Sequence, residues 1–375
     1  MNWIKEHKVT VFVIILFVGI VLSPLVLHNQ TYPMVSGDTE HHIDNIFQMQ
    51  NGENVYLYAG ELIIGKIVIL IDKVTNKGLM DSFLFINYLA LAGIVLTLVL
   101  VAGKLVNKKA GLLVIPVALF CTQSILKLFA WGTIFSIINM YIILPIALFM
   151  LVRWFIKKQK MYLIASFVMF GLFGAFHPTA IYVPLAFAIF FPAYMFVKRN
   201  DGRRELLKIG ALGVGIITIV LVSAYFAQPV ITGIVSHSVA IVTTGSSDVA
   251  YPAITFMNFI FSFVTMATLG ILIISIAGII QYRKEMKMTN GTQTFLWIIA
   301  CFIPPMAIMA FTELMIAPAR SCADMSTMIA IIAACLAGIL LTHKRSFVLT
   351  GIILLLVGIG MIPTLATWFG LVGEI

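Results

Sequence analysis

Charged residues are scarce in this chain. Asp, Glu, Lys and Arg make up 10% of its 375 residues, while 61% are hydrophobic and the mean hydropathy is +1.07. An ordinary soluble domain has roughly 25% charged residues. A soluble core could not hold this much apolar surface. The composition therefore excludes a soluble enzyme and predicts an all-α fold, that of a polytopic helical membrane protein.

Two other features are missing. Cys121, Cys301 and Cys335 fall within apolar runs and Cys322 stands alone, so the four cysteines form no disulfide framework. The sequence also contains no glycine-rich phosphate-binding motif. The formal net charge of +9 would suit a nucleic-acid-binding protein. However, the basic residues form short clusters between apolar runs, where they orient membrane helices, and we therefore expect no nucleic-acid partner.

Eleven apolar runs qualify as membrane helices, which need about 20 apolar residues. They are Val9–Leu27, Phe83–Gly103, Ala110–Leu126, Ile134–Val152, Met161–Phe176, Ala180–Val197, Ile209–Ala227, Ile254–Ile280, Thr294–Met315, Met325–Thr342 and Phe347–Phe369. We expect the first run to be a retained anchor, because no small-residue cleavage site follows it. The runs predict a single transmembrane domain over residues 1–375.

A twelfth stretch, Tyr56–Ile71, carries Glu61 and Lys66 in its middle. Its polar residues follow helical spacing, which is typical of an amphipathic helix that lies in the membrane interface. At a bilayer centre each charge would cost about 2.5–3.5 kcal/mol, and the sequence supplies no obvious partner for either. We therefore expect this segment not to cross the membrane.

The positions of the basic residues favour the same topology. If Tyr56–Ile71 does not cross and the N-terminus is cytoplasmic, 19 of the 24 Lys and Arg residues lie inside. If the segment did cross, this bias would be reversed. The first external loop then covers residues 28–81, and most acidic residues are external.

This external loop contains a dense cluster of ionisable residues, with three carboxylates and two imidazoles in seven positions. They are Asp38, Glu40, His41, His42 and Asp44. No Lys or Arg between Lys8 and Lys66 neutralises them. In a membrane protein with so few charges, such a concentration indicates catalysis or ion binding.

The cluster has three interpretations. Asp38 could cap a helix that starts at Thr39, with a solvated polar turn behind it. Asp38 could instead act as a general base. Alternatively, the side chains of His41, His42 and Asp44 could bind a divalent cation. Carboxylate oxygens favour Mg²⁺ or Mn²⁺ and imidazole widens the choice, although the spacing matches no fixed metal motif.

Two further residues lie at predicted external helix ends. His177 precedes Pro178 between two apolar runs, where its imidazole could simply sit at the interface. Arg320 is the only arginine predicted to be external, and its planar guanidinium suits a phosphate group. It could instead extend to lipid headgroups or pair with Glu313.

This organisation resembles the GT-C superfamily of membrane glycosyltransferases, which use polyprenyl-phosphate-linked sugars. One apolar helix is followed by an external loop with an acidic motif and an amphipathic helix. His177–Pro178 then stands at a mid-chain helix junction, and Arg320 precedes a late helix. The stretch Gly37–Ile43 also resembles the Asp-x-x-x-His pattern of bacterial membrane proteins related to the superfamily.

The resemblance implies a GT-C-like fold and an inverting transfer of a sugar from a polyprenyl-phosphate donor to a glycan, lipid or protein acceptor at the outer face of the cell membrane. Asp38 would match the family's external-loop acid and Glu40 its second acidic position, both as catalytic residues. Arg320 would match a phosphate-facing arginine, and His177 would also face the donor phosphate.

The sequence departs from the family in two respects. We expect no large soluble C-terminal domain of the kind that many members carry, and the sequence shows no tryptophan-rich motif of the kind found in oligosaccharyltransferases. The alternative functions are a transporter or flippase for lipid-linked saccharides, and a non-catalytic assembly partner in envelope polysaccharide synthesis. Against transport, the sequence shows no inverted repeat and few charges in the middle of apolar runs.

Overall fold

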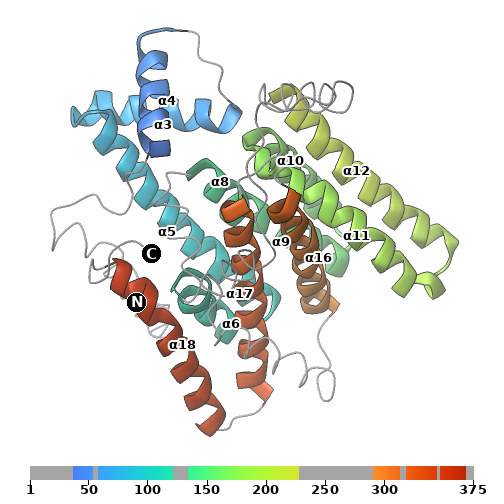
Figure 1. The fold of residues 1–375 in the computed structure, drawn as a ribbon. Helices are drawn as coiled ribbons and strands as arrows, with labels where there is room; N and C mark the ends of the chain where they lie inside the picture. The colour runs from blue at the N-terminus through green and yellow to red at the C-terminus, as the bar shows by residue number, and fades with distance from the viewer. Residues whose placement is uncertain are drawn as a thin grey trace, which may run out of the picture.

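The computed structural model describes residues 37–53, 58–120, 134–227, 290–312, 318–343 and 347–368 (Figure 1). Within these ranges every regular element is a helix, so the all-α prediction is confirmed there. The α-helices are α3 (Gly37–Gln50), α4 (Ala59–Thr75), α5 (Leu79–Leu105), α6 (Lys108–Ile115), α8 (Ile134–Ile138), α9 (Leu144–Lys157), α10 (Lys160–Phe176), α11 (Tyr182–Val197), α12 (Arg203–Ala227), α16 (Asn290–Thr312), α17 (Pro318–His343) and α18 (Phe347–Trp368). Four short turns complete them: the π-helical η1 (Pro116–Phe120) and η2 (Asn139–Ile143), and the 3₁₀-helical η3 (Pro178–Ile181) and η4 (Arg199–Asp201).

Six segments in the described part of the chain are long and apolar enough to cross a membrane. They are Leu79–Leu105, Ile134–Lys157, Pro178–Val197, Arg203–Ala227, Gly291–Met309 and Ser321–Thr342. Lys160–Phe176 and Thr350–Ile359 are apolar but shorter. The predicted runs Val9–Leu27 and Ile254–Ile280 fall outside the described ranges. The polytopic prediction is therefore confirmed, while the number of eleven spans stays a prediction.

The bundle is held together by close helix packing. Helices α5, α6, α17 and α16 pack in that order, α11 joins α16 to α12, and α12 packs on α10. At one point α6 and α17 touch backbone to backbone, because a Cβ added at Gly338 would clash with the backbone of Ala110. Small residues permit such approaches, which matter in membranes because lipid-embedded helices associate mainly through van der Waals contact.

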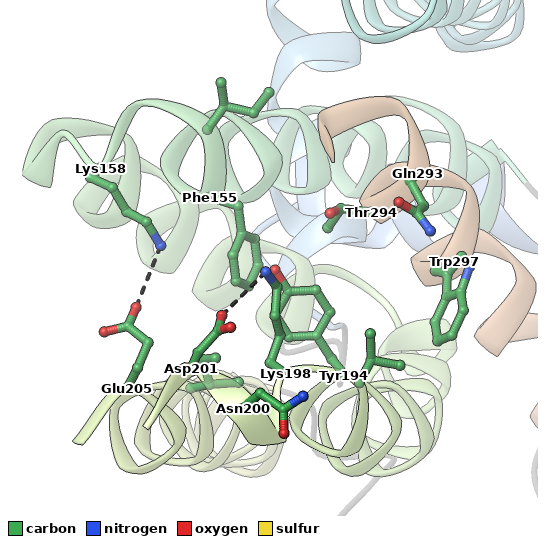
Figure 2. Close-up of a pocket in the computed structure, with 13 residues that line it drawn as sticks. Phe155, Lys158, Tyr194, Lys198, Asn200, Asp201, Glu205, Gln293, Thr294 and Trp297 are labelled. Atoms are coloured by element: carbon green, nitrogen blue, oxygen red, sulfur yellow. Dashed lines mark ion pairs between the residues drawn. The ribbon is translucent and has the colours of Figure 1, made fainter. Parts of the chain in front are cut away.

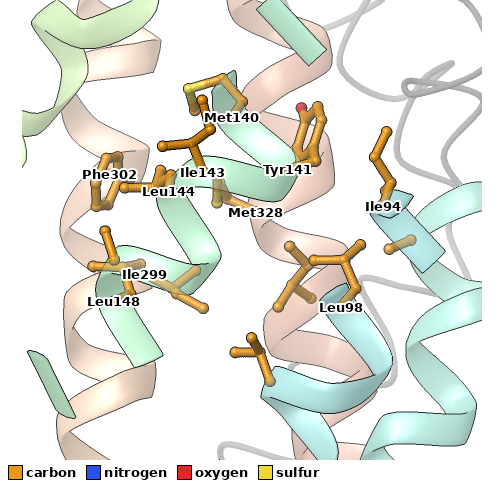
Figure 3. Close-up of a cluster of buried hydrophobic side chains, with 14 of the residues drawn as sticks. Ile94, Leu98, Met140, Tyr141, Ile143, Leu144, Leu148, Ile299, Phe302 and Met328 are labelled. Atoms are coloured by element: carbon orange, nitrogen blue, oxygen red, sulfur yellow. The ribbon is translucent and has the colours of Figure 1, made fainter. Parts of the chain in front are cut away.

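Buried side chains from α5, η2, α9, α16 and α17 fill the centre of the bundle (Figure 3). The labelled ones are Ile94, Leu98, Met140, Tyr141, Ile143, Leu144, Leu148, Ile299, Phe302 and Met328. Large apolar side chains also cover much of the outer surface, as on α10, α12 and α18. An apolar exterior around an apolar core is what a lipid-embedded bundle requires.

A π-helical turn interrupts the helix that runs from Ile134 to Lys157. Pro145 has no N–H and so cannot bond to the carbonyl of Tyr141, four residues earlier. Instead the N–H of Leu144 bonds to the carbonyl of Asn139, five residues earlier. Asn139 and Tyr141 are both buried within this wider turn. Such turns occur frequently at functional sites.

Helices α3 and α4 lie at one end of the bundle, and α4 runs across the direction of α5 (Figure 1). Helix α4 packs on α3, α5 and α10. At its start Gly60 is pressed against α10, because an added Cβ would clash with the carbonyl oxygen of Phe176. The segment is helical and has two distinct faces, as the sequence predicted.

The two faces of α4 do not follow the usual pattern, in which apolar residues face the protein and polar residues face away from it. The face toward the bundle carries Glu61, which is only 3% exposed. The outer face is mainly apolar, and its exposed residues are Leu62, Ile63, Lys66, Ile67, Leu70, Lys73 and Val74. An outer face of this kind suits contact with lipid, with the lysines reaching for the headgroups.

Within the described part of the chain, basic clusters around Lys109, Lys158 and Lys198 lie at the opposite end of the bundle. Lys158, after α9, pairs with Glu205 near the start of α12 at 3.7 Å. At the same end the Thr292 hydroxyl donates to the carbonyl of Leu105 at 2.6 Å, and the Lys109 ammonium donates to the carbonyl of Leu341. This separation of basic clusters from α3 and α4 is consistent with a cytoplasmic basic end, which stays a prediction.

We expect a cysteine placed at Asn51 to react with a membrane-impermeant maleimide applied to intact cells. A cysteine at Asn200 should react only after permeabilisation, because it lies among the basic residues. Both positions are exposed, so accessibility alone cannot separate them. Labelling at Gly245, outside the described ranges, should follow Asn51, and labelling at Asn107 should follow Asn200. Labelling of the Asn200 position in intact cells would contradict the topology.

Candidate functional site

A buried carboxylate joins α4 to α3. Nδ1 of His42, a residue 8% exposed, lies 2.8 Å from Oε1 of Glu61. The side-chain amide of Asn45, one turn further along α3, donates to the same oxygen at 3.0 Å. Because the carboxylate accepts, His42 carries its hydrogen on Nδ1 in this contact. Glu61 therefore fixes one face of α3 against α4.

The sequence supplies no obvious partner for Glu61, whereas the structure provides one. Its partner lies 19 positions away, on the preceding helix. The sequence did not reveal the pair because Glu61 was assigned to the interfacial polar side of its helix. One signal could have revealed this pair. His42 and Glu61 lie on the two predicted helices of the same external loop, and an imidazole and a carboxylate can form a hydrogen bond when both are buried.

The predicted metal ligands do not converge. His41 and Asp44 are exposed on α3, whereas His42 is directed to Glu61. His41 Nε2 lies 3.3 Å from the amide of Asn45. Across the described residues no three His, Cys, Asp or Glu side chains are grouped to hold a metal ion. The set His41, His42 and Asp44 therefore does not fit a shared cation, and no reaction step is assigned to one.

The acidic residues lie near the start of α3. This helix begins at Gly37 rather than Thr39, so Asp38 lies in its first turn and the N-cap interpretation is wrong. A negative charge in the first turn of a helix is still favourable, by about 0.3–1 kcal/mol, because the N-terminal end of the helix dipole is positive. Glu40 is exposed. The side chain of Asp38 is outside the described part of the structure.

A row of rings connects His42 to His177. Phe135 of α8 meets the His42 ring edge-on at 4.6 Å between centroids. Tyr58 then contacts Phe135 at 5.7 Å and His177 at 5.2 Å, both nearly perpendicular. Two residues 135 positions apart, each predicted to belong to the site, are therefore separated by only two intervening rings.

His177, which the sequence predicts to face the donor phosphate, also caps the short helix η3. Pro178 disfavours helix at the residue before it, and His177 accordingly adopts extended backbone angles at the end of α10. Nδ1 of His177, a buried residue, accepts from the backbone N–H of Thr179 at 3.2 Å. With Nδ1 accepting, a neutral His177 carries its hydrogen on Nε2. The amide of Asn139 fixes the junction by donating to Phe173 and Thr179.

The N-terminus of α17, which carries Arg320, is anchored at the same end. Tyr182, directly after η3, lies 3.0 Å from the hydroxyl of Ser321. One turn further on, the Tyr141 hydroxyl donates to Asp324 at 2.6 Å. Asp324 and Tyr141 were not predicted as site residues, although an Asp close to an apolar run was a signal for them. The Arg320 side chain and Glu313 are not among the described parts.

One of three comparisons with known proteins finds a similar fold. No protein-family model matches the chain, and no curated protein matches it. Among solved structures it is similar to the apo form of the Archaeoglobus fulgidus oligosaccharyltransferase, with a TM-score of 0.64 and 13% identity. The match covers 98% of this chain and 57% of the archaeal protein, so the chain spans little more than half of that protein's length. At this identity the likeness shows the fold alone, which this chain shares with that archaeal protein.

Proposed function

We propose that this protein is a membrane glycosyltransferase that transfers a sugar from a polyprenyl-phosphate donor to a glycan, lipid or protein acceptor at the outer face of the cell membrane. The observation that carries the proposal is a gathering of elements at one end of an oligosaccharyltransferase-like bundle. The acidic start of α3, the helix α4, His177 and the first turn of α17 all lie there.

The proposed reaction is a displacement at the anomeric carbon. Asp38 accepts the proton of an acceptor hydroxyl as its oxygen forms the new bond to that carbon. Glu40 acts as the second acidic residue of the site. The bond from the anomeric carbon to the phosphate oxygen breaks, and attack from the opposite side inverts the configuration. The negative charge that develops on the leaving phosphate is stabilised by Arg320 and by a hydrogen bond from His177.

The outer face of α4 would guide the donor. Its exposed apolar side chains include Ile63, Ile67 and Leu70, which lie on the side away from Glu61. A polyprenyl chain can lie along such a face while its phosphate reaches the end of α17. Dependence on Mg²⁺ or Mn²⁺ stays a prediction from the sequence.

Transfer from a polyprenyl-phosphate-linked sugar in proteoliposomes tests the proposal. We expect Arg320→Lys to raise the KM for the donor about tenfold, because lysine keeps the charge but loses the planar fork that binds two phosphate oxygens. The matched control is Arg204→Lys, an exposed residue at the opposite end. Movement of a labelled donor across the bilayer without any transfer would favour the transporter alternative. An assembly partner would show neither activity.

A further inference from the structure

A cavity of about 720 Å³ opens at the end of the bundle opposite the proposed site (Figure 2). Its walls come from α9, α11, η4, α12 and α16. Cavities of this size, between about 300 and 1,000 Å³, are typical of small-molecule sites. Neither the α3–α4 elements nor His177 line it, so the proposed transfer reaction does not use it.

Charges of both signs line this cavity. Lys198 lies 3.2 Å from Asp201, and Lys158 lies 3.7 Å from Glu205, as the dashed lines of Figure 2 mark. The second distance exceeds that of a hydrogen bond. The side chains of all four residues are between 34% and 56% exposed, and ion pairs of this kind are weak. Both cations and both carboxylates can therefore exchange partners with a ligand.

The cavity also has an apolar edge. Ile156 and Val197 line it and are 48% and 56% exposed, at the ends of helices predicted to be embedded in lipid. Trp297 lines it too, in keeping with the aromatic residues that mark membrane interfaces. A charged hollow that borders on a lipid-facing surface suits an amphipathic ligand.

We propose that this cavity binds the headgroup of a phospholipid that carries both a phosphate and a primary amine. Lys158 and Lys198 donate to the phosphate, and Asp201 and Glu205 accept from the ammonium. The acyl chains leave along Ile156 and Val197. Lys208 occupies the other oxygen of Glu205, at 3.2 Å, which leaves Oε1 for the ligand.

The lining discriminates between headgroups. A headgroup with a phosphate but no amine would bring its negative charge close to the carboxylates of Asp201 and Glu205. Neither carboxylate would gain an ammonium partner. A choline headgroup has no N–H to donate, and it needs an open aromatic cage. Here Phe155 is packed against Tyr194 at 5.2 Å between ring centroids, and the Lys158 ammonium already lies over the Phe155 ring at 5.7 Å, so these rings form no open cage for choline.

Native mass spectrometry of the delipidated full-length protein tests this proposal. The probes are dioleoyl phosphatidylethanolamine, phosphatidylglycerol and phosphatidylcholine, titrated separately. We expect phosphatidylethanolamine to bind about tenfold more tightly than the other two, as charge-assisted hydrogen bonds to the carboxylates would give. The double variant Asp201→Asn/Glu205→Gln should lose that preference, and Lys158→Gln/Lys198→Gln should bind all three lipids more weakly.

Two further variants keep the test decisive. Gln293→Trp fills the cavity and leaves every charge in place, so it should weaken binding even if a charge variant fails to fold. Asp81→Asn, at an exposed position on the other end of the bundle, should bind like the unmodified protein. Tighter binding of phosphatidylglycerol would overturn the proposal, as would an unchanged preference in the carboxylate variant or an equal loss in Asp81→Asn.

Discussion

Replacing Asp38 by Asn is expected to slow sugar transfer by about 10²–10⁴-fold, the usual contribution of a general base. Asparagine keeps the shape of the side chain but cannot take up the proton of the acceptor. The structural cost should be small, because an acid in the first turn of α3 contributes only about 0.3–1 kcal/mol through the helix dipole. The measurement is transfer from a polyprenyl-phosphate donor in proteoliposomes, normalised to the amount of reconstituted protein.

Glu53→Gln is the matched control for this substitution. Glu53 is an exposed acid just beyond α3, and losing its charge should leave the transfer rate near that of the unmodified protein. If Asp38→Asn were fully active at normal expression, the acidic cluster would be structural. The function of the protein would then be sought in transport or in assembly.

Replacing His42 by Ala is expected to destabilise the protein by about 3 kcal/mol, because it removes one partner of a buried ionisable pair. Glu61 would keep only the amide of Asn45. The neighbouring variant His41→Ala removes the same kind of side chain from an exposed position and should have little effect. Thermal unfolding in detergent measures the difference, and cleavage by a protease near Asn51 should follow it. Equal unfolding temperatures for the two variants would mean that the His42–Glu61 contact does not hold α3 in place.

Most of the helical framework could be predicted from the sequence, because the length of an apolar run is a local property. The predicted runs Phe83–Gly103 and Ala180–Val197 correspond to α5 and to η3 with α11. The start of α3 differs from the prediction: the helix begins at Gly37, two residues earlier, so Asp38 is a first-turn residue and not a cap.

The contacts of the candidate site could be predicted only in part. His42 and His177 were selected from composition and resemblance, but their connection through Phe135 and Tyr58 depends on how distant helices pack. Glu61 shows the difficulty most clearly. An amphipathic pattern defines two faces, yet in a lipid environment an apolar face can point outward and a charged residue inward. The Tyr141–Asp324 bond spans 183 positions, so the place of Asp324 beside an apolar run indicated a polar site but not the partner of that side chain.

The contact of Gly60 with Phe176 also bears on how the chain is assembled in the cell. Phe176 comes 116 positions after Gly60, and at about 5–20 residues per second a ribosome needs about 6 to 23 s to synthesise that interval. Throughout that time α4 lacks the surface of α10 on which it docks, and Tyr58 lacks His177. The segment from α3 to α4 must therefore wait until later helices have been inserted before it can complete these contacts. Completion of this end of the molecule is a late event of biogenesis, and the catalytic arrangement proposed here cannot exist on a partly synthesised chain.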